Sequence, residues 1–524
     1  MKRLSTLSVL FTLNILSVNA QPVFQKTFAG SVNYTGTRAT SATSGIIVAG
    51  TRGSSLGSPE EGILMKTDLS GTISWTKAYG ASGNEIFNIA RQTSDGGYIA
   101  AGYTTSSGAG GRDVLVVKTD ASGNISWAKT YGTVDDEIAY DIIQTTDGGY
   151  ILTGDAKKIN AQTTVGAIYL LKLTSTGTES WSKMWGAGIG NYGYNVIQTS
   201  DGGYMVGGRA NNGFFSFIKT DASGNISFAR ASMPIGIQAV DFSQMIQTSD
   251  GGYAVVGTGT NTSNDAMIVF EKLDATATVT FAKTYNPGTF PMDIGFGLMQ
   301  TWNGGYTIIG YSGNFAPNFA NLYILNISST GVVASAKTST AISYGYTVSF
   351  AVSPLSDGGF AATGTNGTNM VLFKGDGMGN TGCTYTTASA TENTPTYFDN
   401  AITNWTSSGT TITNTSSVTA STVTLTPTSL CSGVGIEETE ISENIEVYPN
   451  PASDELNIDV SGAGLNNSNI TVEIYNSVGE IVQTQNIFSG NIIRVPVSGL
   501  ENGIYFVKIN TEGKFATKTV IVQR

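Results

Sequence analysis

The chain has 524 residues and a net charge of −11, and only 12% of its residues are Asp, Glu, Lys or Arg. It contains no histidine, which excludes Ser-His-Asp and Cys-His catalysis and histidine-ligated zinc. No run of more than two basic residues occurs, so the sequence does not predict a nucleic-acid-binding protein. The 65 glycines, with abundant Thr, Ser, Tyr and Val, favour short strands joined by tight turns and predict an all-β fold.

Residues 1–20 have the pattern of a secretory signal peptide. Lys2 and Arg3 form its positive region, residues 4–18 its apolar stretch, and Val18-Asn19-Ala20 a small-residue cleavage site. Ser, Thr and Asn interrupt this short stretch, and no later segment is apolar over 18 residues. We therefore expect removal after Ala20 and no transmembrane helix in the mature chain.

One phrase, Asp-Gly-Gly-Tyr, recurs along the chain at intervals of about 50 residues. It begins at Asp95, Asp147, Asp201 and Asp250, with variants at Asn303 and Asp357 and a degenerate first copy at Ser44-Gly45-Ile46. Glycine tolerates the positive φ that tight hairpin turns require, so each phrase predicts a turn between two strands. A fixed period of this length identifies a repeat architecture with seven units.

Each unit contains four segments with strand character. In the unit around Asp147 they are residues 138–145, 150–154, 167–173 and 179–185. Four short antiparallel strands per unit are typical of one propeller blade. Residues 21–382 are therefore predicted to form a seven-bladed β-propeller.

The two ends of the repeat region complement each other. Residues 24–28 resemble the fourth strand of a unit, 127–131, whereas the last unit ends after its third strand, 370–374. We predict that the N-terminal strand completes the last blade, which removes an exposed sheet edge. Large aromatic residues recur near the start of the fourth strands, and we expect them to pack between blades rather than bind sugars: Trp75, Trp127, Trp181, Phe228 and Phe281.

The repeat resembles the β-propeller repeats common in secreted bacterial proteins. The resemblance rests on Gly-Asn-Glu-Ile or Asp-Asp-Glu-Ile leading into Gln-Thr-Ser-Asp-Gly-Gly-Tyr. It implies an architecture and leaves the activity open, because propellers host binding, scaffolding and catalysis alike.

Residues 383–435 are rich in Thr and Ser, and Cys383 and Cys431 lie near their two ends. Two cysteines in a secreted chain predict one disulfide, with two unpaired thiols as the alternative. Alternating residues around 417–425 suggest strands, so we expect a small β subdomain. Residues 436–444 form an acidic linker without an apolar period.

Residues 445–524 alternate apolar and polar side chains between Gly and Asn turns, which predicts an Ig-like antiparallel β-sandwich. The segment resembles the type A C-terminal sorting domain of the Bacteroidetes type IX secretion system. The resemblance rests on its opening and its penultimate strand, with the motif residues Tyr448, Pro449, Asn450, Pro451, Gly503 and Tyr505. It implies recognition by an outer-membrane translocon, removal by a sorting peptidase, and a final location outside the cell or on its surface.

Two functions remain open for the propeller. The first is a surface binding or adhesion module for a glycan or a protein, without catalytic residues. The second is a carboxylate-based hydrolase or lyase acting on carbohydrate, with acidic residues near the blade starts: Glu85, Asp135, Asp136, Glu137, Asp241 and Asp293. Turn formation explains these acids more simply, so we expect no enzyme and no cofactor. The turns after Asp120 and Asp221 leave a weakly bound structural calcium ion as an alternative.

Overall fold

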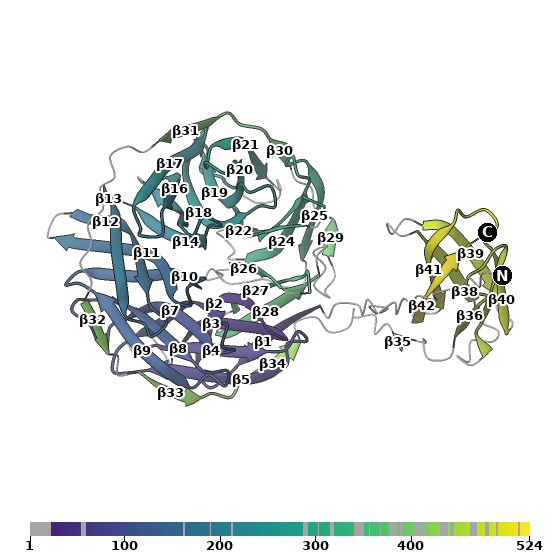
Figure 1. Cartoon of the computed structure of the whole chain (residues 1–524), viewed down its shortest axis with the longest axis horizontal. Coiled ribbons are helices and arrows are strands. Elements are labelled where there is room, and N and C mark those ends of the chain that lie inside the picture. The colour runs from purple at the N-terminus through teal and green to yellow at the C-terminus, as the bar shows by residue number, and fades with distance from the viewer. Residues whose placement is uncertain are drawn as a thin grey trace, which may run out of the picture. The chain divides into compact units, whose positions relative to one another are not determined.

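Figure 1 shows a computed structural model of the chain, which divides into two compact units, Met1–Cys431 and Ser432–Arg524. The structure describes residues 23–53, 59–160, 163–188, 190–210, 213–286, 292–301, 303–314, 319–339, 351–355, 357–366, 368–376, 385–387, 391–401, 412–415, 418–429, 439–440, 445–461, 469–476, 481–488, 491–511 and 514–523. The predicted signal peptide and both cysteines lie outside these residues. The described residues form strands and turns and no α-helix, which confirms the all-β class; none of their segments is an apolar helix long enough to cross a membrane.

The described residues of the first unit form seven antiparallel groups of four strands. The first three groups are β2–β5 (Asn33–Ala42, Gly45–Gly53, Glu61–Thr67, Ile73–Gly80), β6–β9 (Glu85–Gln92, Tyr98–Thr104, Asp113–Thr119, Ile125–Gly132) and β10–β13 (Asp136–Gln144, Tyr150–Asn160, Thr163–Leu173, Glu179–Gly188). The next three are β14–β17 (Tyr192–Gln198, Tyr204–Ala210, Phe214–Thr220, Ile226–Pro234), β18–β21 (Ile237–Gln247, Tyr253–Asn261, Ala266–Leu273, Val279–Asn286) and β22–β25 (Met292–Gln300, Tyr306–Asn314, Phe319–Ile327, Val333–Ser339). The seventh combines β26–β28 (Ala351–Pro354, Phe360–Asn366, Asn369–Gly375) with β1 (Phe24–Ala29).

Each Asp-Gly-Gly phrase forms the predicted turn between the first two strands of a group. At Asp95, the carboxylate oxygen Oδ1 accepts a hydrogen bond from the Gly97 amide at 3.0 Å, while Gly96 adopts a φ of 82°. The second carboxylate oxygen lies 2.8 Å from the Lys118 ammonium group, on the third strand of the same group. The same ion pair recurs at Lys172–Asp147, Lys219–Asp201, Lys272–Asp250 and Lys374–Asp357. Each Asp-Gly-Gly phrase therefore forms a turn whose aspartate is paired with a lysine from the third strand of the same group.

Consecutive groups pack face to face through repeated contacts. The Tyr79 hydroxyl, at the end of β5, donates to the Gly123 carbonyl of the next group at 2.8 Å, and Tyr131 does the same to Gly177 at 2.6 Å. The Trp127 ring lies against Gly177 and makes an edge-on contact with Tyr150 at 6.1 Å. Strands of each group contact the next group in the chain, and β2 contacts β26, β27 and β28 of the last. In Figure 1 the groups lie around a common centre, with the first strands innermost and the fourth strands outermost.

The N-terminal strand joins the last group as predicted. β1 pairs antiparallel with β28, and Phe24 lies opposite Lys374 while Phe28 lies opposite Met370. Phe28 and Met370 are fully buried in one hydrophobic cluster. Strands from the two ends of the repeat region thus share one sheet and one core.

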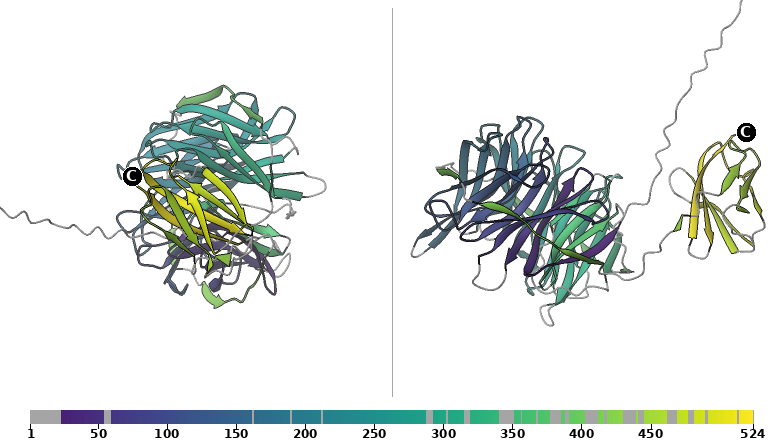
Figure 2. Two further views of the ribbon diagram at one scale, coloured as in Figure 1. Left: turned by 90° about the vertical axis from the view of Figure 1, so that its right-hand side faces the viewer. Right: turned by 90° about the horizontal axis from the view of Figure 1, so that it is seen from below.

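After β28 the chain continues as an outer segment, residues 385–429, which pairs with the fourth strands of successive groups. Its described strands are β29 (Tyr385–Thr387), β30 (Thr391–Asn393), β31 (Tyr397–Ala401), β32 (Ile412–Thr415), β33 (Thr419–Thr422) and β34 (Thr426–Ser429). They pair antiparallel with β25, β21, β17, β9, β5 and β1, in that order. The segment therefore runs backwards past the groups along their outer edges (Figures 1 and 2).

The strands of the outer segment are spaced at regular intervals along the sequence. In five of the fourth strands, a Lys or Arg near the middle lies opposite a residue of the outer segment, and these residues are separated by multiples of seven: Thr387, Ala401, Thr415, Thr422 and Ser429. This arrangement differs from the small β subdomain expected from the sequence. Strands of three to five residues are too short to form a stable sheet by themselves, whereas each fourth strand offers an unpaired edge.

The second unit consists of two sheets that share one hydrophobic core. One sheet has the order β36-β37-β40 (Glu446–Tyr448, Glu455–Asp459, Ile492–Pro496), and the other β35-β42-β41-β38-β39 (Thr439–Glu440, Lys514–Val522, Gly503–Thr511, Asn469–Tyr475, Ile481–Phe488). Leu456 and Val495 from the first sheet are buried with Val472, Val507 and Val520 from the second. Alternation of apolar and polar residues produces this core, since only one face of each sheet points inward.

Candidate functional site

The first strands of six groups each contain a β-bulge at the same place. A bulge inserts one unpaired residue, bends the strand and redirects a side chain, which is why bulges are common next to binding sites. The inserted residues are Thr37, Asn88, Tyr140, Tyr194, Ser243 and Phe296. All six line one cavity of about 480 Å³. One local irregularity, repeated in six of the seven groups, therefore builds a single site.

Aromatic rings form one wall of this cavity, which we call the aromatic cavity. The rings of Tyr140 and Tyr194 lie 5.0 Å apart, and Phe242 stacks on Tyr194 at 6.2 Å with an interplanar angle of 8°. Burial raises the pKa of both tyrosines, so their hydroxyls stay protonated at neutral pH. Flat apolar faces beside hydroxyl and amide groups are suited to organic ligands with hydroxyl groups.

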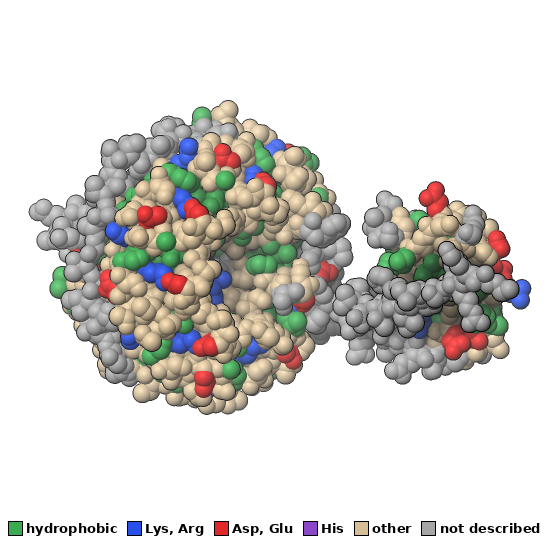
Figure 3. Space-filling model, in the orientation of Figure 1, with side chains coloured by type: hydrophobic (Ala, Val, Ile, Leu, Met, Phe, Trp, Pro, Cys, Tyr) green, Lys and Arg blue, Asp and Glu red, His purple; other side chains and the backbone are tan. Residues whose placement is uncertain are grey.

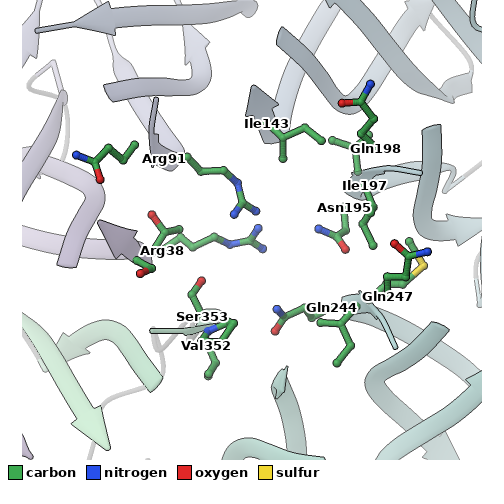
Figure 4. A pocket seen from close by; sticks show the side chains of 17 residues that line it. Arg38, Arg91, Ile143, Asn195, Ile197, Gln198, Gln244, Gln247, Val352 and Ser353 are labelled. Atoms are coloured by element: carbon green, nitrogen blue, oxygen red, sulfur yellow. The ribbon is translucent and has the colours of Figure 1, made fainter. Parts of the chain in front are cut away.

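A second cavity of about 550 Å³ is lined by other residues of the first strands, and we call it the arginine cavity. Its lining includes Arg38 and Arg91 together with uncharged polar side chains such as Asn195 and Gln244. Figure 4 shows the two guanidinium groups side by side, extending across the cavity toward Asn195. Arg38 lines both cavities, so the two sites adjoin. The space-filling view shows a hollow in the middle of the face formed by the groups (Figure 3).

Asp141 is the acidic partner of both arginines. Its carboxylate is fully buried, and Oδ1 lies 3.0 Å from Arg91 Nη2 and 3.9 Å from Arg38 Nη1. The other oxygen, Oδ2, accepts a hydrogen bond from the Asn195 amide group at 2.6 Å and from the Val196 backbone at 3.2 Å. Burial lowers the pKa of Arg38, Asp141 opposes this effect, and the neighbouring Arg91 adds to it.

Three of the six acidic residues singled out from the sequence accept hydrogen bonds from backbone amides. Glu85 and Glu137 are buried; Glu85 accepts from the Ala81 amide at 2.7 Å and Glu137 from the Thr133 amide at 2.8 Å. Asp136 accepts from the Arg112 amide at 3.0 Å, and the Asp135 backbone donates to the Thr133 hydroxyl. These four residues line neither cavity.

Asp241 and Asp293 have different surroundings. Asp241 lines the aromatic cavity and forms an ion pair with Arg209. Asp293 is fully buried, and burial raises its pKa to about 7, an effect that the neighbouring Ser312 hydroxyl opposes. Among the described residues that line the two cavities, Asp241 is the one carboxylate.

The loops considered for calcium show ordinary turn chemistry. Asp120 Oδ1 accepts hydrogen bonds from the Ser122 and Asn124 amides at 2.9 and 2.8 Å, and Asp221 makes the equivalent bonds to Ser223 and Asn225. These bonds satisfy the carboxylate oxygens within the turn.

The motif residues of the second unit connect its beginning to its last strand. Asn450 Oδ1 accepts from the Ile521 amide at 2.8 Å, and its side-chain amide donates to the Thr519 carbonyl at 3.1 Å. Pro449 and Pro451 both follow cis peptide bonds, and the Tyr448 side chain is exposed. Tyr505, two residues after Gly503, is buried, and its hydroxyl donates to the Glu501 carbonyl at 3.0 Å.

Sequence reasoning missed the bulge residues and the arginine pair. A signal for the first was present, because each of these residues stands seven positions before the Asp, Asn or Ser of its turn phrase; Tyr140 and Asp147 are one example. No comparable signal marks Arg38 and Arg91, which come from different groups and meet only in the fold.

Comparison with known families identifies one part of the chain. The family described as Secretion system C-terminal sorting domain matches residues 446–523, which lie within the second unit. This match supports export by the type IX secretion system, through contact with its machinery, to the cell surface or the extracellular space. Comparison with curated proteins gives no match.

Proposed function

We propose that the first unit is a seven-bladed β-propeller that binds a glycan in its two inner cavities outside the cell. The observation that carries the proposal is the convergence of six bulged side chains on one cavity with an aromatic wall. Six of the seven proposed blades each contribute a bulged side chain to this site, so most of the ring takes part in building it. A binding or adhesion role at the surface agrees with export by the second unit.

Three features support the propeller. Four-strand groups repeat with the period of the sequence, successive groups contact one another, and the first group contacts the last. The pairing of β1 with β28 joins the two ends of the repeat region, as in propellers that close through their N-terminal strand.

Binding is favoured over hydrolysis by the distribution of acidic groups. Glycoside hydrolysis in most enzymes uses two carboxylates on opposite sides of the scissile bond. Among the described lining residues the cavities offer only Asp241, which is ion-paired to Arg209, and Asp141 is committed to the arginines.

The second unit would act as the export tag, with an Ig-like sandwich fold. Residues 1–20 direct the chain through the inner membrane, the translocon recognises residues 445–524, and a sorting peptidase removes them. An exposed apolar strip on neighbouring strands β41 and β42 offers a docking surface for the translocon: the side chains of Ile504, Phe506 and Ile521 are 49%, 37% and 40% exposed. Apolar patches of this kind on soluble domains commonly mark interaction sites.

We also propose that Cys383 and Cys431 form a disulfide. The described part of the outer segment begins on β25 in the sixth group and ends on β1 in the seventh. Since these groups are neighbours, a bond between residues just before and just after the segment would close it around the propeller.

A glycan array probed with the full-length protein tests the binding function. We expect retention of one class of saccharide without release of reducing ends, and weaker retention by Tyr194→Leu and Asn88→Ala. Tyr448→Ala, which removes an exposed ring from the second unit, is the matched control and should bind normally. Release of reducing ends would favour the hydrolase instead, and retention unaffected by Tyr194→Leu would place binding elsewhere.

A further inference from the structure

The two arginines of the arginine cavity present more positive charge than the structure neutralises. Arg38 and Arg91 come from β2 and β6, the first strands of neighbouring groups, and share the single carboxylate of Asp141. This local excess of positive charge contrasts with the chain as a whole, which has 38 acidic and 27 basic residues.

The contacts of Asp141 leave Arg38 with free hydrogen-bonding capacity. Arg91 lies within hydrogen-bond distance of Asp141 at 3.0 Å, whereas Arg38 approaches it only to 3.9 Å. Within the described part of the chain, the Arg38 guanidinium donates no hydrogen bond. Its side chain is 17% exposed and lines the arginine cavity, so its unused donors open on that cavity.

Two like charges held side by side in a partly buried site repel each other, and an anion between them relieves that repulsion. The lowered pKa of Arg38 reflects both its burial and its proximity to Arg91. Arginine remains protonated in proteins, so the pair keeps its charge at neutral pH. Its planar guanidinium groups match the two oxygens of a carboxylate especially well.

We propose that Arg38 and Arg91 bind the acidic group of an anionic saccharide, with a uronate carboxylate as the best fit. This inference rests on the proposed glycan-binding function and names the class of glycan. The surrounding side chains are uncharged, and the polar ones among them, including Asn195, Gln244 and Ser353, can bind sugar hydroxyls (Figure 4). Since Arg38 also lines the aromatic cavity, a chain of sugar rings can place an acid on the arginines and a neighbouring ring on Tyr194.

Calorimetric titration of the full-length protein with matched saccharides tests this inference. The probes are oligogalacturonate, oligoalginate and hyaluronan oligosaccharides, each with its neutral methyl ester, and a sulfated galactan oligosaccharide. We expect an acidic oligosaccharide to bind roughly tenfold or more tightly than its methyl ester, as expected for a charge-assisted hydrogen bond. Arg38→Gln and Arg91→Gln should each remove most of that difference. Tighter binding of the sulfated probe than of every uronate would identify a sulfate ester as the ligand group.

Arg52→Gln is the matched control, because Arg52 pairs with Glu61 at 2.6 Å and lines neither cavity. If an arginine variant does not fold, the salt dependence of binding to the wild-type protein tests the inference instead. The affinity for the acidic oligosaccharide must fall with added salt, while the affinity for its methyl ester does not. If acids and esters bind equally tightly and Tyr194→Leu weakens both, the proposal of an acidic ligand is overturned. The proposed glycan-binding function would then still stand. Failure of all the probes to bind would overturn the inference, and the glycan array then tests the broader function separately.

Discussion

Phe28 lies opposite Met370 in the pairing of β1 with β28, and both side chains are fully buried although they come from the two ends of the repeat region. Closure by this strand predicts that Phe28→Ala destabilises the first unit by about 3–5 kcal/mol, the usual cost of a large-to-small change in a core. Thr27→Pro should be at least as damaging, because proline removes a backbone donor from a strand paired on both sides. Denaturant unfolding measures both effects, and wild-type stability in either variant would contradict closure by β1.

The turn aspartates predict a loss of stability in acid. Hydrogen bonds from Lys118 and Thr93 lower the pKa of Asp95 to about 2, and the pKa values of Asp147 and Asp250 are also lowered to about 2. Because these values lie below those of the unfolded chain, the contribution is complete above about pH 4 and is lost as the pH falls toward 2. The melting temperature should therefore fall over this range.

Asp95→Asn checks the cause of that loss. The variant should melt below the wild type at pH 5, and the difference should shrink at pH 2, where the aspartate is about half protonated. The effect of one pair will be small, since the Asp95 side chain is 61% exposed. A difference that persists unchanged at pH 2 would indicate that the ion pair is not its source.

Asp293 predicts the opposite dependence. Burial raises its pKa to about 7, above that of the unfolded chain, so its effect on stability becomes less favourable as the pH rises from about 4 to 7. Asp293→Asn should raise the melting temperature at pH 8 and change it little at pH 4. If Asp293→Asn is equally destabilised at both pH values, the carboxyl group contributes to packing. It would then not be a buried group that costs stability when it ionises.

The proposed disulfide predicts a protein without free thiols. A thiol-reactive reagent should label the denatured wild type only after reduction, and the Cys383→Ser/Cys431→Ser variant should be less stable by about 4 kcal/mol in the chain-entropy model. Labelling of the unreduced, denatured protein would disprove the bond.

Export should depend on the contacts of Asn450. Asn450→Ala removes both hydrogen bonds to the last strand, and we expect less protein outside the cell. Asn486→Ala is the matched control, because Asn486 accepts an exposed hydrogen bond from Thr471 at 2.7 Å within the same unit. Equal export of both variants would show that the Asn450 contacts are dispensable for sorting.

The sequence predicted what each repeat determines locally. The Asp-Gly-Gly turns and the strands around Asp147 agree with the structure, because turn chemistry and alternation act over a few residues. The pairing of residues 24–28 with 370–374 was also predicted, because comparison of the repeats showed which strand each end lacks. The contact of Trp127 with the following group was also expected, although its side chain is only partly buried.

Features that depend on distant residues and leave no mark in the repeat were not predictable. The strands of the outer segment pair with free edges of the folded groups. The sequence pattern of these short strands does not identify their partners. The arginine cavity has the same origin, since Arg38, Arg91 and Asp141 belong to three different groups. A single unit contains too little information to predict a site shared by several.

The position of β34 on β1 has a mechanical consequence. The proposed Cys383–Cys431 bond would carry a pull from the C-terminal side past the outer segment, so the outer strands bear load only when that bond is reduced. The pull then first loads the four residue pairs from Lys26–Ser429 to Ala29–Thr426. If β34 yields, the load passes to β33 and then to the earlier strands of the outer segment, before it reaches β28. The outer strands would thus detach one after another and dissipate work, while the pairing of β1 with β28 still holds the binding cavities in shape.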